Sequence, residues 1–221
     1  RRLVDTGVLD RVRRGHYAIR QLGVFGTRAA ASDVRLAVAS AFADRPHRIA
    51  YRSALEEHDL ITHAARTICV ATSERMRVRN ISGRPLRVVL EPSDTLHVGA
   101  QEMSGTWVST VERAVLECAS RLDLMGSISV VGEALVASAP RLDPVELERL
   151  ATELKLRAAL RRIGSVADAL EIPGIVGKIK PLGRYTFDVR LEPGSPTVWR
   201  DATWRVSWSQ TVDEVARTIS T

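Results

Sequence analysis

Hydrophobic residues recur at a helical period over much of the chain and form stripes of the kind that face a protein core. The first clear stripe runs through residues 29–43, with Val34, Val38 and Phe42 on one face, and Pro46 ends it. The same period predicts further helices over residues 48–60, 110–122, 126–136, 144–154, over 157–170 with a break at Gly164, and from Thr211 onwards. The apolar faces of these helices are the predicted core.

Two of the predicted helices carry start signals. Ser109 and Glu112 stand three residues apart, as in a capping box, which predicts a helix that begins at about Thr110. Asp143 precedes Pro144, a pair that is typical of the N-cap and the first helical position. We therefore expect Ser109 and Asp143 to cap helices.

Shorter stretches alternate apolar and polar side chains, which indicates β-strands. Residues 66–72, 75–80 and 85–91 do so, and the turn sequence NISGRP separates the last two, so we expect a small antiparallel meander. Residues 183–193 and 202–208 return to strand character near the end of the chain. Helices combined with a small, mainly antiparallel sheet predict an α+β fold.

The opening segment, RRLVDTGVLDRVRRGHYAI, combines two patterns. Residues 1–7 are typical of the last turns of a helix, with Gly7 just past its end. Residues 8–19 alternate around a turn at Gly15, which predicts a tight hairpin. A helix followed by a basic hairpin is typical of the end of a winged helix-turn-helix, whose recognition helix would begin before the first residue. A surface hairpin with scattered arginines is the alternative interpretation.

Positive charge is concentrated in this opening segment. Residues 1–20 hold six arginines and two aspartates, a net charge of +4, whereas the whole chain carries +6. Arginine is a common ligand of DNA phosphates, and a wing can reach phosphates or the minor groove. We therefore predict DNA contacts from the following residues: Arg1, Arg2, Arg11, Arg13, Arg14 and His16.

Size and composition place the chain among globular proteins. With 221 residues, of which 45% are hydrophobic, it can bury a substantial core. No apolar run approaches the ~20 residues that a membrane span needs, and no signal peptide precedes the predicted fold. Cys69 and Cys118 lie in apolar surroundings and are expected to be buried, reduced thiols. We expect a cytoplasmic protein without a membrane partner.

The motifs that would indicate catalysis are incomplete. The stretch GIVGK at residues 174–178 lacks the spacing of a phosphate-binding loop, and no convincing Ser–His–Asp set is present. His58 and His63 are five residues apart, so they do not share a helical face, although with Glu57 they are candidate metal ligands. We expect a binding protein, not an enzyme, with no catalytic residue, metal or cofactor. A metal-dependent hydrolase built on the two histidines is the enzymatic alternative.

Five segments of the chain, in order, resemble the AbiEi-type antitoxins of type IV toxin–antitoxin systems. They are GVLDRVRRGHYAI at residues 7–19, RIAYRSALEEHDLI at 48–61, STVERAVLECASRLDLMGSISVVGEAL at 109–135, LRRIGSVADAL at 160–170 and DATWRVSW at 201–208. Together they span nearly the whole chain, and their order makes the resemblance specific. Two features depart from the family: most of the winged helix is missing, and Gly126 and Ser127 stand where it has a Gly-Gly pair.

The resemblance implies an antitoxin that counteracts, directly or indirectly, a nucleotidyltransferase-like toxin encoded beside it. It also implies an N-terminal winged helix that binds inverted repeats in operator DNA and represses its own operon; we expect a monomer or weak dimer on DNA. The expected organisation is the end of that winged helix at residues 1–22 and an antitoxin domain at residues 23–221, with helices around the small sheet. A ligand-responsive winged-helix transcription regulator is the main alternative.

Overall fold

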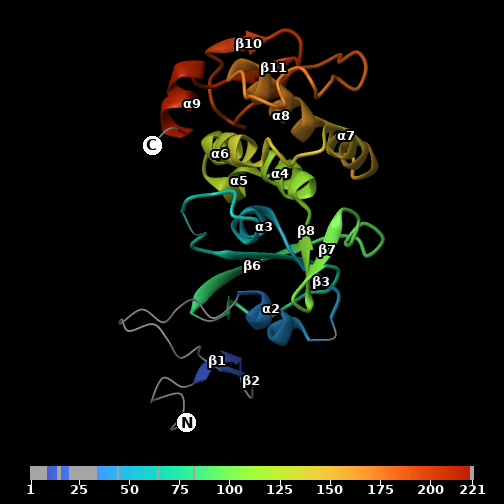
Figure 1. Ribbon diagram of the computed structural model, residues 1–221, viewed down its shortest axis with the longest axis vertical. Coiled ribbons are helices and arrows are strands. Elements are labelled where there is room, and N and C mark those ends of the chain that lie inside the picture. Colours follow the sequence, from blue (N-terminus) through green and yellow to red (C-terminus); the bar gives the residue numbers. More distant parts are fainter. Residues whose placement is uncertain are drawn as a thin grey trace. The chain divides into compact units, whose positions relative to one another are not determined.

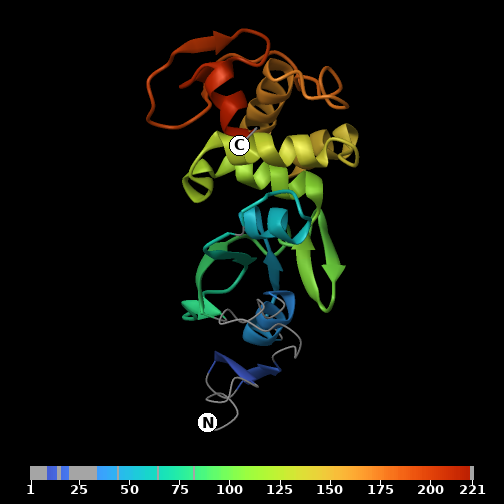
Figure 2. The same cartoon turned by 60° about the vertical axis from the view of Figure 1, so that its left-hand side comes forward.

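The computed structural model describes most of the chain and divides it into two compact units (Figures 1 and 2). The described residues are 9–13, 16–19, 34–43, 45–63, 65–81 and 83–219, with side chains from residue 34 onwards. Unit 1 consists of residues 1–53 and 65–108, and unit 2 of residues 54–64 and 109–221. The chain passes between the units three times, so the region expected to form one domain from residue 23 contributes to both.

Unit 1 is built on a six-stranded sheet with the strand order β5-β6-β4-β3-β8-β7. Its strands are β3 (His47–Ile49), β4 (Ile68–Thr72), β5 (Asn80–Ile81), β6 (Arg84–Leu90), β7 (Ala100–Met103) and β8 (Thr106–Ser109). The pairs β3–β4 and β5–β6 are antiparallel, whereas β4–β6 and β3–β8 are parallel. Helix α2 (Val34–Phe42) contacts β3 and β5 and buries Phe42.

The meander predicted for unit 1 is confirmed only at its second turn: β5 and β6 pair antiparallel, whereas β4 pairs in parallel with β6. Every residue of β4 is buried, as in strands that are covered on both faces, and its partner is the long strand β6. Of the alternating stretch at residues 75–80, only Asn80 joins a strand, the short β5 at the sheet edge. The alternation arises because one side of the segment is exposed. A paired strand would show the same sequence pattern, so the pattern alone cannot distinguish the two.

The helix predicted over residues 48–60 begins later than expected. Residues 47–49 form β3 instead, and α3 spans Tyr51–Glu57. Ile49 pairs with Val70 on one side and Val108 on the other, so sheet pairing overrides the local helical period. The break falls at Tyr51, which adopts a positive φ of 54°.

Unit 2 is mainly helical and carries a small second sheet (Figure 2). Its helices are α4 (Val111–Ser120), α5 (Leu122–Met125), α6 (Ile128–Ser138), α7 (Pro144–Glu153), α8 (Arg157–Ala169) and α9 (Val212–Ile219). Its strands are β9 (Val189–Arg190), β10 (Trp199–Asp201) and β11 (Val206–Trp208), in the order β10-β11-β9. Helix α4 contacts α6, α7 and α8, and Val115 and Cys118 are fully buried, as predicted. The fold as a whole is α+β, as the sequence predicted.

The start signals are half confirmed. Asp143 caps α7, since its side chain accepts a hydrogen bond from the Val145 amide, and Pro144 opens the helix. The cap of α4 is Thr110 rather than Ser109, with the Thr110 hydroxyl accepting from the Arg113 amide. Ser109 belongs to β8, and its hydroxyl donates instead to Glu117 at 2.9 Å.

Helix α8 runs unbroken through Gly164, where a break was predicted. A Cβ atom at this position would lie 2.2 Å from Cζ2 of the buried Trp204, so the missing side chain lets the indole ring lie against the helix. Glycine inside a helix costs about 1 kcal/mol relative to alanine. Here the close packing of Trp204 offsets that cost, and the helix continues.

Candidate nucleic-acid interface

The predicted basic hairpin is present in the backbone. Strands β1 (Leu9–Arg13) and β2 (His16–Ile19) pair antiparallel, with Leu9 opposite Ile19 and Arg11 opposite Tyr17. The register shifts between Arg11 and Arg13, as at a β-bulge, so that Arg13 lies opposite His16. Both strands contact α2, which ties the hairpin to the sheet of unit 1.

The structure brings three of the six predicted DNA-contacting residues together. Arg11, Arg13 and His16 lie on the paired strands, at the end of the hairpin where β1 leads into β2. Arg1, Arg2 and Arg14 lie outside the described residues. The hairpin therefore gathers basic residues along its backbone, as a wing does.

A second basic feature of unit 1 is the extended segment that connects β4 to β5, with the sequence RMRVR at residues 75–79. Arg75, Arg77 and Arg79 are exposed, whereas Met76 and Val78 are half-buried. This alternation predicts a strand, and a strand pattern does not mark the exposed arginines as a separate basic feature. The signal that could have revealed them is the concentration of charge, since residues 73–87 hold five arginines and one glutamate.

The two units differ in charge. Unit 1 contains seventeen arginines and eight acidic residues, a net charge of +9, whereas unit 2 contains fifteen basic and eighteen acidic residues, a net charge of −3. The difference persists without the opening segment, because the remainder of unit 1 from residue 23 still carries +5. The positive charge of the chain is therefore concentrated in unit 1.

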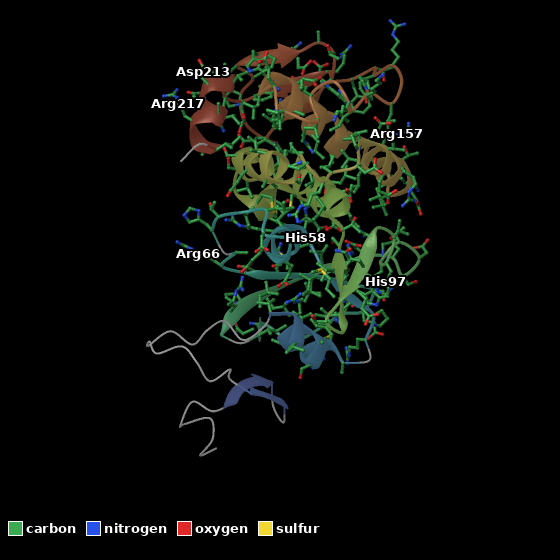
Figure 3. The ribbon with its side chains drawn as sticks, viewed as in Figure 1. His58, Arg66, His97, Arg157, Asp213 and Arg217 are labelled. Atoms are coloured by element: carbon green, nitrogen blue, oxygen red, sulfur yellow. The ribbon has the colours of Figure 1, made fainter. Side chains whose placement is uncertain are left out.

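Two of the three candidate metal ligands, His58 and His63, form hydrogen bonds in the structure; Figure 3 labels His58. His58 is buried, and its Nε2 donates to the Ser109 carbonyl at 2.7 Å, while Arg141 donates to the carbonyl of His58 itself. Burial lowers the pKa of His58, although the bond to Ser109 opposes the shift. His63 is exposed and lies 3.0 Å from the Thr62 hydroxyl. Within the described part of the chain, no group of three or more His, Cys, Asp or Glu side chains is arranged to hold a metal ion.

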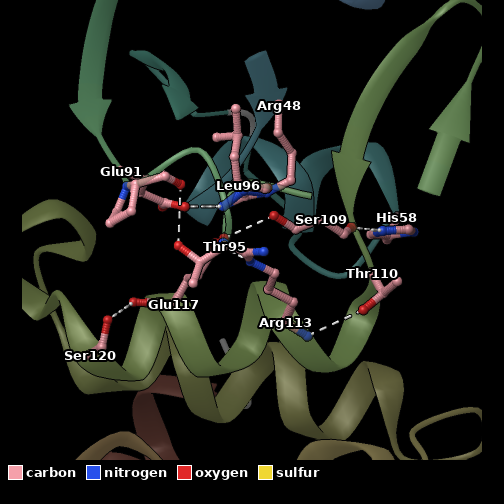
Figure 4. Close-up of polar contacts among 11 residues, drawn as sticks. Arg48, His58, Glu91, Thr95, Leu96, Ser109, Thr110, Arg113, Glu117 and Ser120 are labelled. Carbon is pink, nitrogen blue, oxygen red and sulfur yellow. Dashed lines mark hydrogen bonds and ion pairs between the residues drawn. The ribbon is translucent and has the colours of Figure 1, made fainter. Parts of the chain in front are cut away.

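Buried ion pairs support the backbone in the described part of each unit (Figure 4). In unit 1, Arg48 donates to both carboxylate oxygens of Glu91 at 3.1 Å and to the Leu96 carbonyl at 2.9 Å. In unit 2, Arg113 donates to Glu117 at 2.9 Å, one helical turn away. Charge-assisted bonds of this kind fix loops and helix starts, and both pairs are structural.

A further buried histidine lies in unit 1. His47 donates from Nδ1 to the Arg45 carbonyl at 2.8 Å, which leaves Nε2 to accept from the Thr106 hydroxyl at 2.8 Å. Burial lowers the pKa of His47, against the effect of the Arg45 bond, and nearby His97 lowers it further. His97 stacks on Trp107 with ring centroids 4.8 Å apart. These contacts hold the strand β3 against β8.

Among the helices that the structure describes, none has the length and apolar character to cross a bilayer.

The fold has a counterpart among solved structures. No family model and no curated protein matches the chain. In structure the chain is similar to the Rv2827c protein from Mycobacterium tuberculosis, with a TM-score of 0.68 and 16% sequence identity, over 100% of this chain and 81% of the other. At that identity the similarity shows a shared fold alone.

Proposed function

We propose that the protein is an antitoxin of a type IV toxin–antitoxin system that represses its own operon and counteracts a nucleotidyltransferase-like toxin in the cytoplasm. The proposal rests on the ordered segments that resemble AbiEi-type antitoxins. The observation that carries its DNA-binding half is the hairpin, because Arg11, Arg13 and His16 lie together on paired strands of the basic unit. In this function the hairpin is a wing whose arginines contact phosphates and position the protein on its operator.

The division of charge supports a division of labour. Unit 1, at +9, is suited to operator DNA, whereas unit 2, at −3, has no general attraction for it. The surface that counteracts the toxin is therefore assigned to unit 2. The chain can then bind operator DNA through one unit and counteract the toxin through the other.

The DNA-binding half is tested by substituting Arg11, Arg13 and Arg14 together with alanine. Phosphate contacts carry no sequence information, so binding to operator and to random duplex should weaken alike. The plot of log affinity against log salt should lose about 0.9 in slope for each contact removed. The matched control substitutes three exposed arginines of unit 2 with alanine, namely Arg157, Arg184 and Arg200. Unchanged affinity and slope in the hairpin variant would exclude the wing.

The antitoxin half is tested by growth. Cells that express the adjacent toxin gene should be arrested, and co-expression of this protein should restore their growth. A ligand-responsive transcription regulator would bind DNA normally but give no protection. A metal-dependent hydrolase would contain stoichiometric metal that is lost in the variant His63→Ala.

A further inference from the structure

The segment between β4 and β5 carries three exposed arginines that form a basic feature separate from the hairpin. Arg75, Arg77 and Arg79 alternate with half-buried Met76 and Val78, so apolar side chains anchor the segment. Alternate residues of an extended chain lie roughly 6–7 Å apart. The segment thus places three exposed arginines at alternate positions on the surface of unit 1.

These arginines are open for a ligand. Within the described part of the chain, none of the three forms an ion pair or a side-chain hydrogen bond. A hollow beside two of them, Arg75 and Arg77, has a volume of about 420 Å³ and is also lined by Arg45, Met76 and Val78. Its neighbouring carboxylate, Glu74, lies 3.6 Å from Arg45, and both side chains are about half exposed, so their attraction is weak.

We propose that Arg75, Arg77 and Arg79 form a second DNA-contacting surface, which binds the phosphates of duplex DNA alongside the hairpin. Helix α2 contacts both hairpin strands and also β5, which begins directly after Arg79. The same helix therefore supports both basic features. A repeating row of unpaired guanidiniums suits the repeating charge of a phosphate backbone, which requires no base contact. The inference rests on the proposed function only in assigning both features to the same duplex.

The experiment compares four forms of the full chain on one labelled random-sequence duplex over a series of salt concentrations. They are the parent protein, the hairpin variant, the variant with Arg75, Arg77 and Arg79 replaced by alanine, and the unit 2 control with Arg157, Arg184 and Arg200 replaced. The segment variant should lose about two to three units of slope, roughly 0.9 for each phosphate contact. The control removes the same charge and should keep the parent slope.

The outcomes separate this inference from the proposed function. If only the hairpin variant loses slope, the second surface is wrong and the wing stands. If only the segment variant loses slope, the wing is wrong and the second surface stands. A control that loses as much slope as the segment variant overturns the inference, because net charge alone would explain both. A segment variant that keeps its slope but no longer protects cells from the toxin would make the segment a protein-docking surface. The single variant Arg77→Ala should lose about one unit of slope. It replaces the triple variant in the test if the triple variant is unfolded.

Discussion

The buried arginines of unit 2 and the exposed arginines at residues 75–79 of unit 1 have opposite surroundings. In unit 2, Arg161 is buried and donates to the backbone carbonyls of Trp204 and Phe187 at 2.8 and 2.7 Å, and Arg162 donates to those of Ala119 and Arg190. In unit 1, the arginines of residues 75–79 point to no such acceptor among the described residues. The planar guanidinium group suits both roles, since its several N–H donors can bind several backbone carbonyls at once or bind phosphate oxygens.

The difference shows why the number of arginines is a poor guide to binding surfaces. Unit 2 holds twelve arginines, yet many of these are bonded to carbonyls or carboxylates, and acidic residues outnumber basic ones. Unit 1 also uses arginines structurally, since Arg48 is fully buried against Glu91 and Arg84 donates to the Ala65 carbonyl. What distinguishes unit 1 is its positive net charge, +9 against −3 in unit 2. Substituting the buried arginines of unit 2 should therefore cost stability, whereas substituting the exposed arginines at residues 75–79 of unit 1 should cost DNA affinity.

The largest effect that would sharpen this comparison is expected from Arg113→Ala in unit 2. The side chains of Arg113 and Glu117 are only 3% and 4% exposed, so the substitution removes a buried cation that is paired with a buried carboxylate. Removal of one partner of a buried ion pair typically costs about 3–5 kcal/mol. Urea denaturation followed by tryptophan fluorescence would measure the loss, with Trp107→Phe as background so that the signal comes from the three tryptophans of unit 2.

The matched control for this variant is Arg149→Ala. Arg149 pairs with Glu146 and Glu153 on α7, but its side chain is 51% exposed, so water replaces the lost contacts. The cost should be below about 1 kcal/mol. Equal losses in the two variants would contradict a structural role that depends on burial.

Local signals predicted the elements of unit 2 better than those of unit 1. Helices with a strong apolar stripe and a cap, such as α4 and α7, appear close to where they were expected. The strands of unit 1 depend on partners far along the chain, as Ile49 does on Val70 and Val108. No local pattern encodes those pairings, and so the sequence predicted a helix across β3 and a meander where β4 and β6 are parallel.

The candidate site was predictable to the same degree. The hairpin is local, and alternation around Gly15 was enough to place Arg11, Arg13 and His16 on paired strands. The basic segment at residues 75–79 looks identical to a strand in sequence. Its exposure depends on the pairing of β4 with β6, which leaves the connecting segment outside the central strands of the sheet.

A smaller loss of stability is expected from Gly164→Ala, which tests the packing of unit 2 without touching its charges. The new Cβ would lie 2.2 Å from the fully buried indole of Trp204, so the ring or the helix must move. Overpacking of this kind typically costs about 1–3 kcal/mol, more than the gain in helix propensity. Urea denaturation gives the value, and DNA binding should be unchanged. A more stable variant would show that the ring has room to shift.

The smallest effect concerns pH and compares one buried histidine in each unit. Burial lowers the pKa of His47 in unit 1 and of His58 in unit 2. A folded-state pKa below the unfolded value of 6.5 means that the unfolded chain binds the proton more readily. The contribution of each neutral histidine is therefore complete above about pH 6.5 and is lost as the pH falls below it, towards the folded pKa.

Each histidine should contribute at most about 1.4 kcal/mol per pH unit within that window. Replacement by a side chain that keeps the hydrogen bond but cannot titrate should flatten the pH dependence. The variant His58→Gln retains a donor for the Ser109 carbonyl, and His47→Asn retains one for the Arg45 carbonyl. Urea midpoints measured between about pH 7.5 and 5.5, on either side of the histidine pKa, would test both. On the Trp107→Phe background, the fluorescence signal comes from unit 2. If the units unfold separately, the urea midpoint should depend less on pH in His58→Gln than in the parent. Its pH dependence should be unchanged in His47→Asn. A His58→Gln protein that keeps the full pH dependence of its parent would show that other groups in unit 2 take up the protons.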